Sequence, residues 1–155
     1  MSAKFPVLTF SSFFNNSWKQ HWICCAASMR RRATTDMPPA NGLKEVIGHI
    51  IDSERVFAYR ALVFSRNDNV TLPGFDQDLW AGHANHSTVP LKELAGEFES
   101  VRRSTIGLFR HLDTDAWMRG GTANNNPITV RALAYLIGGH TEHHLEILKS
   151  RYLGN

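Results

Sequence analysis

The sequence predicts an all-α fold: an up-and-down four-helix bundle with a long crossover loop and an atypical first helix. Three segments carry apolar residues at helical spacing, loops rich in Gly, Pro, Asn and Asp separate them, and no segment shows convincing strand alternation. The chain has 155 residues, of which 43% are hydrophobic and 20% charged, as suits a single globular domain. Its two cysteines, Cys24 and Cys25, are adjacent, so a disulfide framework is excluded and a reduced, cytoplasmic protein is expected.

The positive charge of the chain lies in a leader. Residues 1–41 hold five Lys or Arg and one acidic residue, whereas residues 42–155 hold twelve Lys or Arg and thirteen acidic residues. Because a duplex-binding domain needs a basic folded surface, we expect no specific nucleic-acid partner, and at most weak binding through the arginines at 30–32. Those arginines follow the apolar stretch at 5–14, which is the wrong order for an export signal, and no apolar run is long enough to span a membrane. We expect residues 1–40 to be an atypical basic leader with a degenerate first helix, and residues 41–155 to form the bundle domain.

The first strong helix is predicted over residues 43–64, and the second opens near Pro90, a residue suited to the first turn of a helix. The third follows the turn-forming run at 124–127 and ends near Tyr152. The connection at 65–89 is long for a bundle and includes a short helical stretch at 76–84; loops of this length often wall pockets. Each strong helix has one apolar side. In the first helix it is formed by Leu43, Val46, Ile47, Ile50, Phe57 and Ala61, and in the second by Leu91, Leu94, Phe98, Val101, Thr105, Leu108 and Leu112. In the third helix it is formed by Val130, Leu133, Ile137, Ile147 and Leu148.

His140 and His144 occupy the apolar stripe of the third helix, where leucines are expected. They are four residues apart, so both rings leave the same face, about 6 Å apart along the helix axis. A buried imidazole without partners costs about 1–3 kcal/mol, and a divalent metal satisfies both rings at once. On this pair alone, a metal site and two hydrogen-bonded core histidines are equally favoured. His143 points to the edge of the stripe and is predicted to lie at the rim of the site, where it would support the metal ligands without binding the metal itself.

His49, on the first strong helix, decides in favour of a metal. It lies on the flank of that helix, toward a neighbour at the axis spacing of about 8–10 Å that is typical of bundles. One histidine from this helix and two from the third make a three-nitrogen set that leaves positions open for water or substrate, as catalytic sites do. Three imidazoles accept zinc, nickel, copper or iron, so the residues alone leave the metal open. The other histidines are expected to be solvent exposed: His21, His83, His86 and His111.

Three more polar residues of the first helix carry predictions. Ser53 and Arg60 project on the same side as His49, so they are candidates to line a substrate pocket, in which Arg60 would hold an anionic group. Glu54 falls on the apolar side, where a carboxylate needs a partner. A buried ion pair with Arg102 of the second helix is favoured over a role as catalytic base.

Residues 43–153 resemble the DinB-like superfamily, also called the YfiT-like metal-dependent bundles. The resemblance rests on LKEVIGH at 43–49 with DSER at 52–55, on LPGFDQDLW at 72–80, and on TVRALAY at 129–135 leading into GHTEHH at 139–144. It implies that His49, His140 and His144 hold a metal, typically nickel or zinc, in a bundle that is frequently a homodimer. Some relatives look like thiol-dependent S-transferases or isomerases that use a low-molecular-weight thiol, and others look like hydrolases. Residues 36–42 lack the Trp of the family's usual turn.

Three functions of different classes follow. The first is a metal-dependent enzyme, a transferase or hydrolase, that activates a thiol or water on the three-histidine site against a small-molecule substrate. The second is a non-catalytic stress-response or structural module that the metal stabilises, with Phe109, Leu145 and Tyr152 as candidates for a homodimer interface. The third is a nucleic-acid or membrane adaptor that acts through the leader. We rank them in this order.

Overall fold

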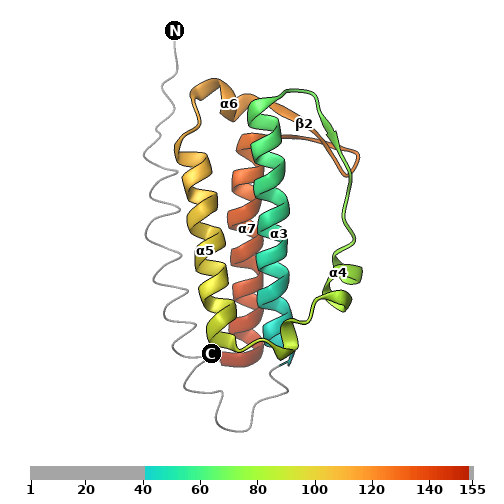
Figure 1. Cartoon of the computed structure of the whole chain (residues 1–155), viewed down its shortest axis with the longest axis vertical. Coiled ribbons are helices and arrows are strands. Elements are labelled where there is room, and N and C mark those ends of the chain that lie inside the picture. The colour runs from blue at the N-terminus through green and yellow to red at the C-terminus, as the bar shows by residue number, and fades with distance from the viewer. Residues whose placement is uncertain (1–40, 154–155) are drawn as a thin grey trace.

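The structure is a computed structural model, and it describes residues 41–153. In that part of the chain three long helices run side by side: α3 (Asn41–Arg66), α5 (Leu91–Arg110) and α7 (Val130–Leu148). α3 and α5 run in the same direction and α7 runs in the opposite one (Figure 1). These are the three helices that the apolar periodicity predicts, so the all-α prediction is confirmed. The helix predicted in the leader lies outside the described residues.

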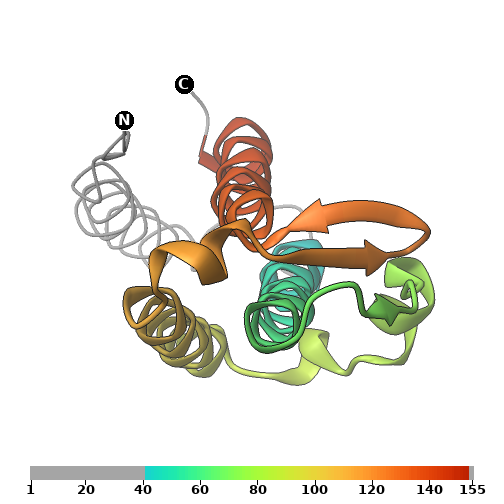
Figure 2. The same cartoon turned by 90° about the horizontal axis from the view of Figure 1, so that it is seen from above.

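The connection from α3 to α5 crosses back along the side of the bundle. It holds β1 (Thr71–Leu72), α4 (Gln77–His83) and the 3-10 turn η2 (His86–Thr88). The short helix predicted at 76–84 is α4, and the carboxylate of Asp76 begins it by accepting hydrogen bonds from the N–H groups of Asp78 and Leu79. Seen down the helices, this crossover lies on the side of α3 away from α5 (Figure 2). The predicted crossover is therefore present, and it packs against α3.

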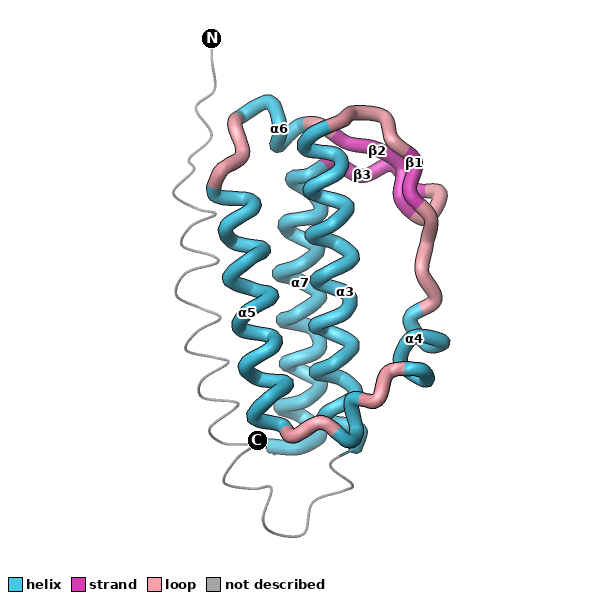
Figure 3. Tube along the Cα trace, viewed as in Figure 1, coloured by secondary structure: helices cyan, strands magenta, loops and turns pink. Residues whose placement is uncertain are grey.

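A small sheet lies at the end of the bundle near α6 (Thr114–Met118), although the sequence prediction contains no strand (Figure 3). β1 pairs in parallel with β2 (Gly120–Ala123), and β2 pairs antiparallel with β3 (Asn126–Thr129). These strands have two to four residues, which is too short for an alternation pattern to be recognised. The chain passes directly from β3 into α7, and the Thr129 hydroxyl caps α7 by accepting from the N–H of Ala132. The hairpin therefore sets where α7 begins.

Two asparagines form the turn between β2 and β3. Asn124 and Asn125 have φ angles of 51° and 61°, both positive, as a type I′ turn requires. We expect Asn125→Val to lower the free energy of unfolding by about 1–2 kcal/mol, because the left-handed conformation is strained for a residue branched at Cβ. Asn125→Gly should not destabilise the protein, because glycine adopts this conformation freely. Urea unfolding measures both variants, and equal stabilities would contradict this account of the turn.

Two apolar clusters fill the space between the long helices, one toward each end, and a polar layer separates them. The polar layer consists of Glu54, Arg102, Thr105 and Thr141, all buried. The buried residues of α5 are Leu94, Phe98, Arg102, Thr105 and Phe109. The other residues of its predicted apolar side are only half-buried: Leu91, Val101, Leu108 and Leu112. The first cluster contains Leu43, Ile47, Ile50, Ile51, Leu94, Phe98, Leu145 and Leu148, and the second contains Phe57, Ala61, Phe64, Phe109, Ala123, Val130, Leu133, Ala134 and Ile137.

Phe109 and Leu145 belong to this core, and each is only 2% exposed. The suggestion that they form a homodimer interface is therefore wrong, because neither side chain reaches the surface. The π-helical turn η3 (Lys149–Leu153) extends the last helix to the end predicted near Tyr152, whose side chain lies outside the description. In the described part of the chain, no helix combines the length and the apolar character needed to cross a bilayer.

Candidate metal centre

Three imidazole rings from two helices converge between α3 and α7. His49 comes from α3, while His140 and His144 come from successive turns of α7, which packs against α3. The Nε2 atom of His140 lies 3.1 Å from that of His49 and 3.2 Å from that of His144. The three candidate ligand atoms all lie within 4.8 Å of one another. The structure thus brings together the three histidines that the sequence analysis singled out.

This donor set fits a divalent cation better than it fits internal hydrogen bonds. A neutral imidazole offers either one N–H or one lone pair at Nε2, yet the Nε2 of His140 faces two other ring nitrogens. Nitrogens bound at about 2.0–2.1 Å to a tetrahedral metal stand about 3.3 Å apart, close to the two separations that involve His140. Three protein ligands also leave a position open, which is typical of catalytic sites and not of closed structural ones.

Burial keeps the three rings neutral, which is the state that binds a metal. Burial, followed by the proximity of the other histidines, lowers the pKa of His140 to about 4. Burial also lowers the pKa of His144, and it lowers that of His49 against the opposing effect of Asp52 and Asp78. Because metal binding requires deprotonated imidazole, the site is ready to accept a cation at neutral pH.

The metal-free protein is expected to lose stability in mild acid through His140. Its pKa is about 4 in the folded protein and 6.5 ordinarily, so between these values the unfolded chain binds more protons. The contribution of His140 is fully present above about pH 6.5 and is lost as the pH falls through this range toward 4. Urea unfolding in the presence of a chelator measures this slope, and His140→Asn should reduce it. An unchanged slope in the variant would contradict the assignment to His140.

Next to the metal centre, the polar layer ties the three long helices together. Arg102 donates from Nε and Nη2 to Oε2 of Glu54 at 3.0 and 2.7 Å, and from Nη2 to the hydroxyl of Thr141 at 2.7 Å. The predicted ion pair between Glu54 and Arg102 is therefore confirmed. Burial raises the pKa of Glu54, and the charge of Arg102 opposes this. Because Thr141 stands on α7 between the two candidate ligands of that helix, the polar layer fixes the position of α7 along its axis relative to α3.

The other predicted site residues lie in three different places. Ser53 is fully buried and lines a pocket next to His49. Arg60 donates from Nη2 to the carbonyl oxygen of Pro73 at 2.9 Å, and its guanidinium lies 5.7 Å from the ring centroid of Phe75, so it braces the crossover. His143 is exposed at the rim, with its ring centroid 5.3 Å from that of His144.

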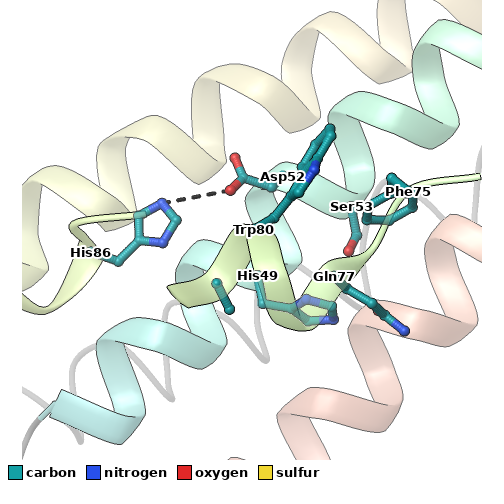
Figure 4. A pocket seen from close by; sticks show the side chains of 8 residues that line it. His49, Asp52, Ser53, Phe75, Gln77, Trp80 and His86 are labelled. Atoms are coloured by element: carbon teal, nitrogen blue, oxygen red, sulfur yellow. Dashed lines mark ion pairs between the residues drawn. The ribbon is translucent and has the colours of Figure 1, made fainter. Parts of the chain in front are cut away.

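The expectation that His86 is exposed to solvent is wrong. Its side chain is only 15% exposed, and its Nε2 lies 3.8 Å from a carboxylate oxygen of Asp52 in the pocket that His49 and Ser53 line (Figure 4). The ring packs against Gly48, where an added Cβ would clash with it. The sequence carries one signal of this contact. Gly48 stands inside a helix, where glycine costs about 1 kcal/mol of stability relative to alanine, and such a glycine indicates that another segment packs closely against the helix.

Among the remaining histidines, His83 and His111 are exposed as expected, and His21 lies outside the described residues.

Comparisons with known proteins agree with this arrangement. The sequence model of the DinB superfamily matches residues 24–148, so the match starts inside the leader. A search of curated proteins finds no match. Among solved structures, YfiT from Bacillus subtilis matches with a TM-score of 0.65 and 16% sequence identity, over 97% of this chain and 91% of that chain. YfiT is described as a probable metal-dependent hydrolase with an unusual four-helix bundle topology. At this identity the likeness shows the fold, and it confirms the predicted four-helix bundle.

Proposed function

The chain belongs to the DinB superfamily, and on this basis we propose that it is a metal-dependent enzyme whose His49, His140 and His144 hold a divalent cation. The observation that carries the proposal is the convergence of the three ring nitrogens within 4.8 Å. The cation, when bound, supplies one kind of chemistry: it lowers the pKa of a water or a thiol so that a nucleophile forms near neutral pH. Imidazole nitrogens bind zinc, nickel, copper and iron, and among these we expect zinc or nickel because the resemblance to the DinB-like bundles implies them.

The chain's own residues provide the substrate site. The pocket between α3 and α4 adjoins His49, and Phe75 and Trp80 of the crossover form one of its walls. Ser53 places a hydroxyl at its base, where a small substrate accepts or donates a hydrogen bond. Arg60 acts here by holding the crossover through Pro73, which keeps that wall in place.

The nucleophile is either water or a thiol. We favour water, because YfiT, whose fold this chain shares, is described as a probable metal-dependent hydrolase. A low-molecular-weight thiol remains the second choice, on the resemblance to thiol-dependent S-transferases. The competing function is a non-catalytic module that the metal only stabilises.

Cobalt substitution separates the enzyme from the non-catalytic module. Azide should change the visible spectrum of the cobalt-loaded protein, because an open coordination position lets it bind beside the three imidazoles. Turnover is then measured with ester and amide substrates, and with small thiols paired with electrophiles. His140→Ala should abolish any activity, and His143→Ala should retain it. An azide-insensitive spectrum without turnover would support the non-catalytic module instead.

A further inference from the structure

The pocket next to the metal centre has its own chemistry. We call it the α4 pocket; His49, Asp52 and Ser53 of α3 line one side, and Phe75, Trp80 and His86 of the crossover line the other (Figure 4). Its enclosed space has a volume of about 10 Å³, which is room for one water-sized group, and the rest of the pocket is open to solvent. Only His49 belongs both to this pocket and to the metal centre. A molecule bound in the α4 pocket therefore lies beside the proposed cation and need not displace the other two histidines.

Ser53 indicates that a polar ligand belongs in this pocket. Its side chain is 0% exposed, and its hydroxyl oxygen has no hydrogen-bond partner among the described residues. A buried hydroxyl without a partner costs about 1–3 kcal/mol, and such groups are rare in folded proteins. Ser53 stands one helical turn after His49 on the same face of α3, so a group that satisfies it lies close to the metal centre.

The outer wall of the pocket is aromatic. The ring centroids of Phe75 and Trp80 lie 5.0 Å apart, and Phe75 in turn packs edge-on against Phe57 in the core. Trp80 is 44% exposed, so part of its indole surface is available to a ligand. Aromatic faces attract flat apolar groups, and they also attract cations through the negative potential of the ring.

The charge of the pocket is negative. Asp52 is the one formally charged side chain among the described residues that line it. Arg55 reaches Asp52 at 3.4 Å, but it also binds Glu97 at 2.7 Å, so one guanidinium is shared between two carboxylates. Arg60, expected to hold an anionic group, is not among the residues that line the pocket.

We propose that the α4 pocket binds a small molecule that carries a protonated amine next to a flat apolar group. The amine donates to the carboxylate of Asp52, the flat group packs on Trp80, and a polar atom of the ligand meets the Ser53 hydroxyl. This inference rests on the proposed function only in taking the bound molecule to be the substrate, because the contacts themselves involve no metal. It replaces the anionic ligand expected from Arg60 with a cationic one.

Three probes of one shape and different charge test this: benzylamine, benzyl alcohol and benzoate. Binding is followed by NMR at the indole signal of Trp80, identified by its loss in Trp80→Phe, at mildly alkaline pH where histidines are neutral. Benzylamine should bind about tenfold more tightly than benzyl alcohol, and benzoate should bind most weakly. The titration is run on the metal-free and on the zinc-loaded protein. Since the metal-free titration depends on the pocket alone, its failure leaves the metal proposal standing, and the reverse also holds.

Charge removal at Asp52 provides the decisive comparison. Asp52→Asn should weaken benzylamine about fivefold to tenfold and leave benzyl alcohol within about twofold, because it removes the charge and keeps the shape. Glu99→Gln removes an exposed carboxylate from α5 and should change neither affinity. Equal binding of benzylamine and benzyl alcohol, no binding of any probe, or an unchanged benzylamine affinity in Asp52→Asn would overturn the proposal.

Discussion

Replacing His140 by alanine is expected to abolish stoichiometric metal binding and the thermal stabilisation that comes with it. The Nε2 of His140 lies 3.1 Å from His49 and 3.2 Å from His144, so it is the donor shared by both close contacts of the cluster. A ligand that binds only the folded state at 100 times its dissociation constant stabilises by about 2.7 kcal/mol, or about 5–10 °C in Tm for a chain of this size. His140→Ala should show no such rise when zinc is added.

His143 supplies the matched control for this experiment. It is a histidine on the same helix, but its side chain is exposed and its Nε2 is not part of the three-ring cluster. His143→Ala should keep the metal content and the zinc-dependent rise in Tm. Metal analysis of the purified proteins and thermal unfolding with and without zinc measure both effects. If the wild-type protein binds no divalent metal, or if His140→Ala binds as much as the wild type, the metal centre is ruled out.

Removing Arg102 should produce the largest loss of stability among single substitutions in the polar layer. Arg102 is 2% exposed and holds both the Glu54 carboxylate and the Thr141 hydroxyl. Arg102→Ala leaves the carboxyl group buried without its partner, and breaking a buried ion pair in this way costs about 3–5 kcal/mol. The free energy of unfolding, measured with urea at neutral pH, reports this loss.

Two comparisons show that the loss comes from the orphaned carboxyl group. The double variant Glu54→Leu with Arg102→Met should recover most of the stability, because apolar side chains of similar size fill the layer without a buried charge. Arg103, the next residue along α5, pairs with Glu99 on the surface at 2.6 Å with 71% of its side chain exposed. Arg103→Ala should therefore cost only about 0.3–0.5 kcal/mol. Equal losses in Arg102→Ala and Arg103→Ala would contradict the structural role of the layer.

The polar layer also bears on the metal centre. Thr141 receives the hydrogen bond from Arg102 and donates its own to the carbonyl oxygen of Ile137, so it is fixed between two helices. His140 is its neighbour in sequence, and the layer therefore sets the register in which His140 meets His49. α5 contributes no histidine to the site, yet its Arg102 determines how the two helices that do contribute face each other.

Much of this protein is determined by local patterns in its sequence. The three long helices follow from apolar residues at helical spacing, because a helix in water needs one continuous apolar face to bury. The two histidines of α7 stood out because they interrupt such a face, and the Glu54–Arg102 pair because buried charges require partners. The start of α4 is also set locally, because the Asp76 carboxylate accepts hydrogen bonds from free N–H groups of the first turn.

Only the tertiary structure decided which residues meet across the connections. Periodicity tells which face of a helix is buried, but it does not tell which loop covers the opposite face. The crossover brings His86 against Gly48 and Asp52, and it takes Arg60 to Pro73, because its path is set by contacts between residues far apart in the chain. The short strands on either side of the predicted turn escaped prediction for the same reason, since pairing between segments and not local alternation holds them. The sequence by itself determined the metal ligands that we propose, and the fold decided what surrounds them.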